Sequence, residues 1–413
     1  MTSSMETESL WEYLKERYRR LVQEHWPPLL GGFLLGVVNV LMFAYARPWS
    51  SSDGIKNWGD WVLLKPLGFV EGKDILPPWL YSTSVINISL VLGAFAAALL
   101  AREFALRVPP RRELVKGLVG GILMGIGANL SLGCTVGGFL SALSALSMSG
   151  LGMMVGLTIG AYLGLKYLLW ELERLPPRPL ASEETPTRRH RNFHFFRATP
   201  PHPPLSKGGQ GGVIHPRSAG WTAFQPYVGV LVILFCVATA LLYDRLGYSE
   251  RGGLFLFGLV LGIINQRSRI CVVRAFREPF MTGDGEHTKG VILALLVGIT
   301  GFAILKWTEL KPIEDFVRAS FWAGSLVGGM IFGVGMVLAG GCGAGTLWRV
   351  GEGQVKLWVA LLGFSLSGAI SWRFLESNGW LERLGKGVFL PDLVGWKLAW
   401  VGLLAVLALW YLG

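Results

Sequence analysis

The chain has 413 residues, of which 52% are hydrophobic and only 16% are charged. Soluble domains carry roughly 25% charged residues, so this composition excludes both an ordinary soluble enzyme and a disordered protein. The formal net charge of +11 matches the Lys and Arg excess of cytoplasmic membrane loops, and no nucleic acid partner is expected. Four scattered cysteines without a Cys/His cluster predict neither a disulfide framework nor a metal site, and we expect no cofactor.

Apolar runs long enough to cross a hydrocarbon core about 30 Å thick recur along the chain. They predict an all-α polytopic membrane protein, embedded in a lipid bilayer, with about ten transmembrane helices. The predicted spans are 29–46, 83–101, 114–131, 151–170, 226–243, 252–266, 289–307, 319–339, 355–372 and 393–412. Residues 1–28 lack the features of a signal peptide, and their amphipathic part is expected to lie on the membrane surface. Four tryptophans are typical of the membrane interface or of external loops: Trp49, Trp58, Trp61 and Trp79.

The distribution of basic residues predicts the orientation. With the N-terminus inside, the cytoplasmic segments hold 24 Lys and Arg and the external ones 12, which predicts that both termini are cytoplasmic. The longest cytoplasmic segment, 171–225, is basic and rich in Pro and Gly, as is typical of a disordered linker. It separates a first membrane unit, 29–170, from a second at 226–413. Its histidines are interpreted as solvated linker residues and not as metal ligands. They are His190, His194, His202 and His215.

An internal repeat relates the two units. Residues 120–137 and 328–345 are identical at eight of eighteen aligned positions, and both contain a Gly-Cys pair. A weaker match pairs 32–39 with 258–265, and its extension sets Tyr45 opposite Cys271. Because an unpaired span follows the first four, the second unit enters the membrane upside down. Inverted repeats of this kind build many transporters, with the substrate site between the halves.

Each Gly-Cys pair closes an apolar span and precedes a segment too short to cross, 139–149 or 346–354. This pattern predicts re-entrant half-helices, which are tolerated at depth only inside protein or beside a water-filled cavity. The N-terminus of a half-helix suits an anion, and a thiol there adds a soft S–H donor. We therefore predict that both pairs contact the substrate. They are Gly133-Cys134 and Gly341-Cys342.

Polar residues crowd the inner end of the span 252–266. Asn265, Arg267 and Arg269 come just before Cys271, and Arg274 and Arg277 follow it. Arginines can draw anions into a pore mouth, although plain anchoring at the cytoplasmic interface explains them equally well. We predict that the first three of these residues and Cys271 belong to the substrate path.

Two further residues complete the expected site and its surroundings. Asn129 lies at membrane depth just before Cys134, where polar side chains usually face an interior or a cavity. Cys236 lies on the unrepeated span and is interpreted as core packing. By the face from which each element starts, Cys134 is expected to lie away from Cys342.

Three motifs carry a resemblance to a known family. They occupy residues 127–134, 268–283 and 337–355, and they begin Gly-Ala-Asn-Leu, Ser-Arg-Ile-Cys and Val-Leu-Ala-Gly. Through them the chain resembles the YeeE/YedE family of bacterial sulfur-transport membrane proteins, the longer YedE-like branch in particular.

This resemblance implies an inverted-repeat fold in the bacterial inner membrane and uptake of thiosulfate. It also implies a relay in which the thiols of Cys134, Cys271 and Cys342 hold the ion without covalent chemistry. A small TusA-like sulfur-carrier protein is the implied cytoplasmic partner. The resemblance also implies an entry-side cysteine in the first repeat, as thiosulfate-uptake members of the family carry. This chain has Tyr45 at that position instead.

The sequence therefore predicts a transporter, not an enzyme, that imports a small sulfur oxyanion, with thiosulfate as the first candidate. Two alternatives stay open. One is transport of a selenium species through the same thiols, since YedE-like proteins are also linked with selenium metabolism. The other is a membrane thiol–disulfide oxidoreductase, which three thiols in one core favour and the absence of adjacent cysteine pairs in the sequence disfavours.

Overall fold

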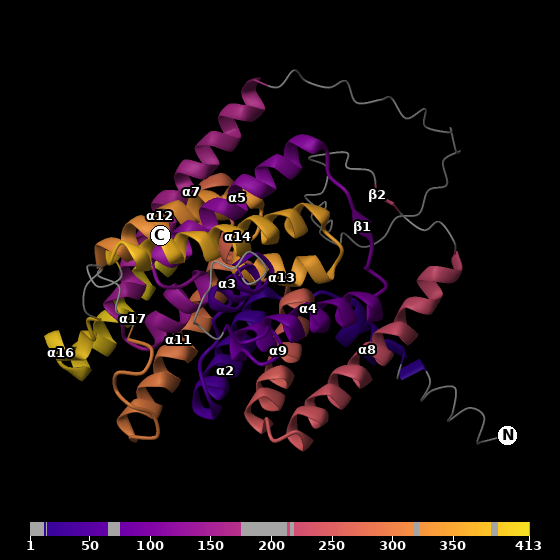
Figure 1. Cartoon of the computed structure of the whole chain (residues 1–413), viewed down its shortest axis with the longest axis horizontal. Helices are drawn as coiled ribbons and strands as arrows, with labels where there is room; N and C mark the ends of the chain where they lie inside the picture. The colour runs from indigo at the N-terminus through magenta and orange to yellow at the C-terminus, as the bar shows by residue number, and fades with distance from the viewer. Residues whose placement is uncertain are drawn as a thin grey trace, which may run out of the picture.

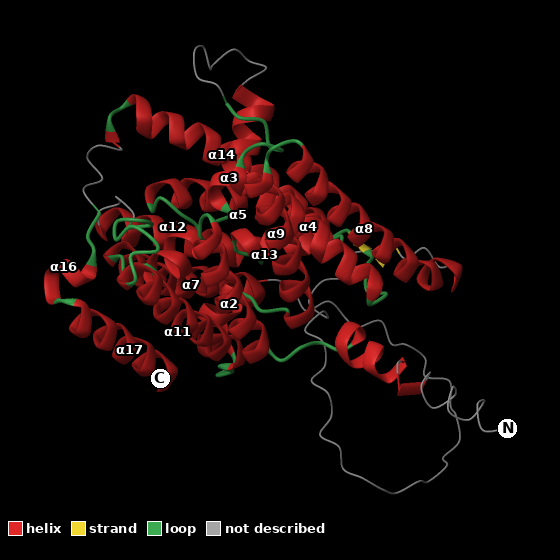
Figure 2. Ribbon diagram, turned by 90° about the horizontal axis from the view of Figure 1, so that it is seen from below, coloured by secondary structure: helices red, strands yellow, loops and turns green. Residues whose placement is uncertain are grey.

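The computed structural model describes residues 12–13, 15–64, 75–174, 213–214, 219–317, 322–380 and 387–412, and these are almost entirely helical (Figure 2). Among them, nine helical stretches are long and apolar enough to cross a membrane. The long helices are α2 (Pro28–Tyr45), α4 (Ser82–Leu100), α5 (Arg111–Leu130), α7 (Met148–Arg174), α8 (Ala219–Arg245), α9 (Ser249–Ser268), α11 (Glu286–Trp307), α12 (Trp322–Ala339) and α14 (Val355–Ser377). The tenth predicted span corresponds to α17 (Trp396–Leu412), an apolar helix of 17 residues. The predicted all-α polytopic membrane protein is thus confirmed.

Shorter elements connect the long helices. They are η1 (Arg19–Gln23), α3 (Ser52–Gly59), η2 (Asp60–Leu64), η3 (Thr135–Ser141), α6 (Ala142–Ser144), α10 (Val272–Met281), α13 (Gly343–Gly351), α16 (Leu390–Val394), and the antiparallel pair β1 (Leu106–Arg107) and β2 (Val213–Ile214). The helices η3 and α13 begin the two re-entrant segments directly after Cys134 and Cys342, a few residues earlier than the predicted bounds of 139–149 and 346–354. Most of the predicted linker, including its four histidines, lies outside the described residues.

Prolines set the starts of several helices. Pro28 is the first residue of α2, and Pro110 directly precedes α5. The fixed φ of proline and its missing N–H suit the first helical turn, where backbone N–H groups have no partner inside the helix. The apolar run after each proline then continues as a helix because every backbone group within a membrane must be satisfied inside its own segment.

The packing of the helices repeats when the two units are exchanged. α2 packs on α11 as α9 packs on α4, and α5 packs on α14 as α12 packs on α7. The short helices follow the same rule, because α3 contacts α4 and α14 where α10 contacts α11 and α7. α8 stands between the units in the chain and packs on α4 and α9, along one edge of the molecule (Figure 1).

Glycines at the helix crossings carry this repeat at the level of single residues. A Cβ atom placed on Gly32 of α2 would lie 1.9 Å from the carbonyl oxygen of Gly290 in α11. A Cβ atom placed on Gly258 of α9 would lie 2.5 Å from the carbonyl oxygen of Ile86 in α4. Only glycine lets two membrane helices approach so closely. The sequence match that aligns residue 32 with residue 258 therefore reflects two equivalent crossings.

α5 and α12 cross antiparallel at the centre of the protein. A Cβ atom on Gly120 would lie 2.6 Å from the carbonyl oxygen of Gly335, and one on Gly127 would lie 2.6 Å from that of Gly328. In the repeat, Gly120 aligns with Gly328 and Gly127 aligns with Gly335. The two contacts therefore become each other when the units are exchanged. Equivalent helices that cross antiparallel are related by a two-fold axis perpendicular to them, which makes the repeats inverted.

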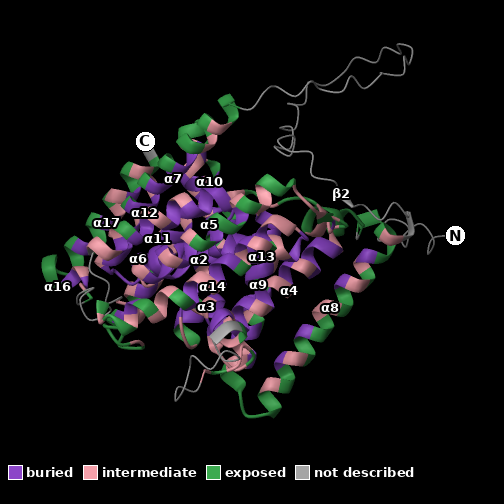
Figure 3. Cartoon of the chain, turned by 45° about the horizontal axis from the view of Figure 1, so that its top comes forward, coloured by how far each residue is buried: buried purple, intermediate pink, exposed green. Residues whose placement is uncertain are grey.

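Buried residues are concentrated where the two units meet, while α8 and α16 expose most of their surface (Figure 3). Only 17% of the apolar window of α8 is buried. Its exposed side chains are large and apolar, as expected for a helix that faces lipid. The polar and thiol side chains of interest lie instead between the units.

Candidate functional site

Three cysteines occupy the same local position, as the N-cap residues of the short helices η3, α10 and α13. They are Cys134, Cys271 and Cys342, and all three are buried free thiols. The residue two positions before each has a left-handed backbone, with φ of 50° at Leu132, 50° at Arg269 and 82° at Gly340. A left-handed residue ends the preceding helix, and the next helix then starts at the thiol.

The three thiols converge near the N-terminus of α13. A Cβ atom placed on Gly345 would lie 3.2 Å from Sγ of Cys342 and 3.9 Å from Sγ of Cys271. A Cβ atom placed on Gly343 would lie 3.4 Å from Sγ of Cys134. The expectation that Cys134 lies away from Cys342 is therefore wrong. The helices that lead to these cysteines, α5 and α12, run in opposite directions. The short helices η3 and α13 that follow nevertheless have their N-termini close together between the two units.

A cavity of about 20 Å³ borders this cluster. Cys342, Ala344 and Gly345 at the N-terminus of α13 form one part of its wall, and Asn265 and Trp49 form another. The other lining residues are aliphatic, and no lining residue in the described part of the chain is charged. The volume has room for about one water molecule. In this conformation the cavity beside Cys342 is therefore too small for a larger ion.

Trp49 is a site residue that sequence reasoning missed. The sequence predicts only packing at the membrane interface or in an external loop for it. In the structure the residue is 2% exposed and lines the cavity. Its backbone N–H donates to Oδ1 of Asn39 at 2.8 Å, and its carbonyl accepts from the hydroxyl of Ser141 at 2.8 Å. Asn39 aligns with Asn265, which lines the cavity from the other unit. The position of Trp49 just beyond the Asn39 span was the available signal.

The other predicted residues of the Gly-Cys spans have packing contacts. The side-chain amide of Asn129 donates to Gly368 O at 2.6 Å and to Ser371 Oγ at 2.7 Å, so it ties α5 to α14. A Cβ atom on Gly133 would lie 2.5 Å from Gly138 N. One on Gly341 would lie 3.2 Å from Leu357 Cδ2. Both glycines allow the chain to turn tightly just before a cysteine.

Arg267 and Arg269 are engaged with carboxylates at the C-terminal end of α9. Nη2 of Arg267, a residue that is 2% exposed, lies 2.6 Å from Oε2 of Glu103, and Nη2 of Arg269 lies 3.3 Å from the same oxygen. Gln266 donates to Glu103 at 2.9 Å and to Glu352 at 3.1 Å. An arriving anion would therefore meet an ion-paired cluster and not free cations.

The charge of Glu103 depends on these partners. Burial alone would raise the pKa of its carboxyl, but attraction to Arg267 and Arg269 and to His25 outweighs burial and lowers it. Nη1 of Arg267 also donates to the carbonyl of Val22 at 2.5 Å. The cluster thus ties the N-terminal segment to the C-terminal end of α9.

Tyr45 lies outside the thiol cluster. It is 48% exposed, and its hydroxyl donates to the carbonyl of Ser249 at 3.1 Å. The equivalence of α3 with α10 instead places Ser51, the buried N-cap residue of α3, at the position of Cys271. The ungapped alignment missed this because the connection from α2 to α3 is longer than that from α9 to α10.

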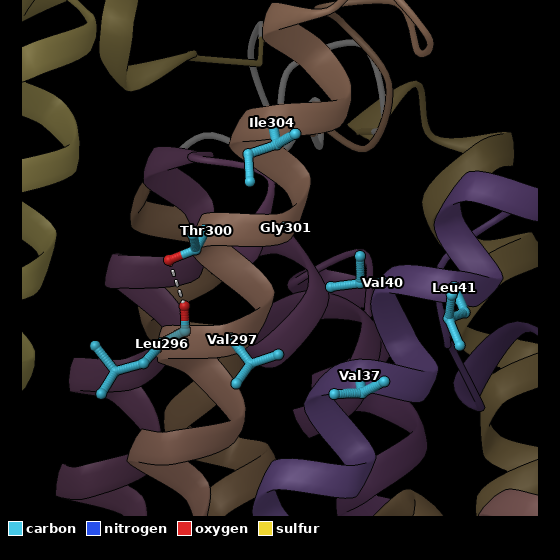
Figure 4. Close-up of a pocket in the computed structure, with 8 residues that line it drawn as sticks. All are labelled: Val37, Val40, Leu41, Leu296, Val297, Thr300, Gly301 and Ile304. Carbon is cyan, nitrogen blue, oxygen red and sulfur yellow. Dashed lines mark hydrogen bonds between the residues drawn. The ribbon is translucent and has the colours of Figure 1, made fainter.

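Two features lie apart from the site. Cys236 of α8 packs with Val85 and Phe255 in a separate apolar cluster, as predicted. An apolar groove of about 480 Å³ lies between α2 and α11 (Figure 4). Its lining hydroxyl, that of Thr300, donates to the carbonyl of Leu296 at 2.8 Å. The groove therefore offers an anion little to bind.

A family model described as sulphur transport matches residues 5–163 and 267–413. The chain belongs to the sulphur transport family. The matched residues include Cys134, Cys271 and Cys342 and leave out Cys236. The predicted family is confirmed, and the chain is a multi-pass membrane protein of a transporter family.

Relatives in this family carry two kinds of name. "Probable transporter YedE" of Escherichia coli K12 is 26% identical over 377 residues, which are 86% of this chain and 82% of that protein. The protein of the same name in Salmonella typhimurium LT2 is 25% identical over 376 residues, with the same shares. "Thiosulfate transporter TsuA" of Spirochaeta thermophila is 36% identical over 137 residues, which are 32% of this chain and 39% of that protein.

Proposed function

We propose that this chain imports a small sulfur oxyanion, with thiosulfate as the first candidate, across the bacterial inner membrane. The thiols of Cys134, Cys271 and Cys342 are its successive contacts. The observation that carries this proposal is the convergence of the three thiols around Gly343 and Gly345. A thiol is a weak, polarizable S–H donor, so it can hold a sulfur anion briefly without capturing it.

Three helix N-termini strengthen the site. η3, α10 and α13 each start at one of the thiols, and the N–H groups in the first turn of a helix have no partner inside that helix. The positive ends of these helix dipoles favour an anion between the two units. Because the cavity lining carries no charged residue in the described chain, attraction stays moderate. Moderate attraction is what conduction requires, since an ion held too tightly would not leave.

The remaining predicted residues have supporting roles in this proposal. Gly133 and Gly341 keep the turns that aim the thiols, and Asn265 adds a polar group to the cavity wall. Asn129 positions α5 through its bonds to α14. Arg267 and Arg269, held by Glu103, form the inner boundary of the path. Since the cavity holds about one water, uptake requires part of the cavity wall to move.

The proposal places both termini and the linker 171–225 in the cytoplasm, between membrane units at 29–170 and 226–413. The excess of Lys and Arg on that side supports this orientation. A TusA-like sulfur carrier is the proposed cytoplasmic acceptor of the imported sulfur. The names of the TsuA relatives support thiosulfate as the substrate, and a selenium species is the alternative for the same thiols.

Uptake of sulfur-labelled thiosulfate into proteoliposomes tests this function, with sulfate and selenite as competitors. Cys134→Ser, Cys271→Ser and Cys342→Ser are each expected to lower uptake at least about tenfold, because a hydroxyl is a smaller and less polarizable donor than the thiol it replaces. A tenfold loss corresponds to about 1.4 kcal/mol. Cys236→Ser is the matched control, since it removes a buried free thiol from α8. Size-exclusion chromatography measures the amount of folded protein.

Different outcomes contradict different parts of the proposal. Wild-type uptake by Cys342→Ser would rule out the relay while leaving transport intact. Absence of thiosulfate uptake by folded protein, together with uptake of selenite, would identify a selenium transporter.

One observation favours a second candidate, a thiol–disulfide oxidoreductase. The sulfur atoms of Cys271 and Cys342 both lie within 4 Å of the position that a Cβ atom on Gly345 would occupy. A disulfide requires two cysteines that are close together, with Cβ atoms about 3.5–4.5 Å apart. Mass spectrometry of oxidised and reduced protein separates the two candidates. A Cys271–Cys342 crosslink that reverses with reductant, in protein that takes up no anion, would favour the oxidoreductase.

A further inference from the structure

Trp49 combines three properties that its place in the sequence does not suggest. Its side chain is 2% exposed, which makes it one of the largest fully buried side chains in the described chain. It lines the cavity that Cys342 also lines. Its indole Nε1 has no hydrogen-bond partner among the described residues. A large ring with an unsatisfied donor therefore stands beside a proposed substrate contact.

The backbone of Trp49 is held while its indole N–H is not. Asn39 accepts from the Trp49 N–H, and Ser141 donates to the Trp49 carbonyl, both at 2.8 Å. The cavity wall includes Leu35, Val136 and Leu140, whose side chains cannot accept a hydrogen bond. An unsatisfied buried donor costs roughly 1–3 kcal/mol. An acceptor that enters the cavity would remove this cost.

The groups around the cavity specify what kind of acceptor suits it. They include the S–H of Cys342 and the first-turn N–H groups of α13, of which that of Gly345 donates to Cys342 Sγ at 3.3 Å. Asn265 also lines the cavity, and its side-chain N–H donates to the Leu261 carbonyl at 2.8 Å. The indole N–H of Trp49, another lining residue, has no partner among the described residues. Among the lining residues that the structure describes there is no carboxylate to receive an O–H and no Lys or Arg. Hydrogen phosphate carries an O–H group that needs an acceptor, and the lining offers it no carboxylate. The cavity therefore suits an oxyanion that carries no proton, such as thiosulfate or sulfate.

The size of the cavity gives Trp49 a second task. About 20 Å³ holds one water and no oxyanion, so a wall must move before an ion can bind. Trp49 has the largest side chain of the lining residues, and it lies on the irregular connection between α2 and α3. Side chains on such connections can shift at a lower cost than residues within a packed helix.

We propose that Trp49 is a substrate-binding residue whose indole N–H donates to a fully ionised oxyanion held at Cys342, and whose ring closes the cavity until the ion arrives. This inference rests on the proposed transport function and names the class of ion that the site accepts.

The first test compares Trp49→Phe with Trp58→Phe in the thiosulfate uptake assay. Trp49→Phe keeps a bulky ring but removes the N–H, so KM is expected to rise about five- to tenfold with the amount of folded protein unchanged. Trp58 is the matched control, because its Nε1 is also buried without a partner among the described residues but its side chain does not line the cavity. A wild-type KM in folded Trp49→Phe would overturn the proposal.

The second test does not depend on transport. Trp49→Ala is expected to increase the rate at which N-ethylmaleimide alkylates Cys342 at least about tenfold over the rate in Trp58→Ala, as followed by mass spectrometry. Thiosulfate or sulfate is expected to slow this alkylation, and hydrogen phosphate to slow it less. Alkylation of Cys236 in the same sample reports unfolding.

These outcomes separate the two proposals. Equal Cys342 alkylation in both alanine variants, with Cys236 protected, would overturn the role of Trp49. Faster alkylation of Cys342 in Trp49→Ala, together with no uptake by the wild-type protein, would support the role of Trp49 in the cavity and contradict transport.

Discussion

Cys271 and Cys342 face the same point, the position that a Cβ atom on Gly345 would occupy at 3.9 Å from one sulfur and 3.2 Å from the other. The two residues start different helices, α10 and α13, which lie far apart in the sequence. The space between the thiols therefore exists because position 345 carries no side chain.

Gly345→Ala is expected to fill this space and to lower thiosulfate uptake at least about tenfold, as a lost thiol contact would. The flexible Cys342 side chain can shift by a few tenths of an ångström, so the amount of folded protein should change little. Gly402→Ala is the matched control, since a Cβ atom there meets nothing within 4 Å. Normal uptake by Gly345→Ala would indicate that the substrate does not pass between these thiols.

Gly32→Ala is expected to destabilise the fold by at least about 1–3 kcal/mol. Its Cβ atom would lie 1.9 Å from the carbonyl oxygen of Gly290, and a backbone atom cannot swing aside as a side chain can. α2 and α11 would have to separate. Thermal unfolding in detergent measures the loss against Gly402→Ala, and equal midpoints for the two variants would contradict the crossing described here.

Glu103→Gln is expected to destabilise the protein by roughly 3–5 kcal/mol, because it leaves the buried guanidinium of Arg267 without its carboxylate. Glu24→Gln is the control, since Glu24 pairs with Arg19 on the surface and exposed pairs contribute about 0–1 kcal/mol. The double variant Glu103→Gln with Arg267→Gln should recover part of the loss. If both single variants unfold at the same temperature, the cluster contributes no more than a surface pair.

The same cluster predicts a pH dependence. The pKa of Glu103 is lowered in the folded protein, so its contribution is complete above its ordinary value of 4.5 and is lost as the pH falls through the folded value. The pKa of His25 is lowered as well, by burial first and then by Arg269. Its contribution therefore starts to fall near its ordinary value of 6.5.

Unfolding midpoints measured from pH 8 to pH 3 test this dependence. The wild-type midpoint is expected to decline in two steps as the pH falls, and Glu103→Gln should lack the lower step. An acid profile of Glu103→Gln that parallels the wild type would contradict the assignment.

The membrane fold could be predicted from the sequence because its signals are local. An apolar run either is or is not long enough to cross a bilayer, and no distant residue changes that. The repeat of 120–137 at 328–345 likewise predicted an inverted pair, which the antiparallel crossing of α5 and α12 bears out. The Gly-Cys pairs marked the starts of η3 and α13, since glycine and a small N-cap residue are features of the chain itself.

Only the tertiary structure decided which side chains meet. Cys134 lies beside Gly343 because two re-entrant helices end their approach between the units, and the face from which each one starts does not determine that depth. Trp49 is buried because Asn39 and Ser141 hold its backbone against the cavity. The contacts of Cys134 with Gly343 and of Ser141 with Trp49 join residues far apart in the chain, so local sequence patterns do not contain them.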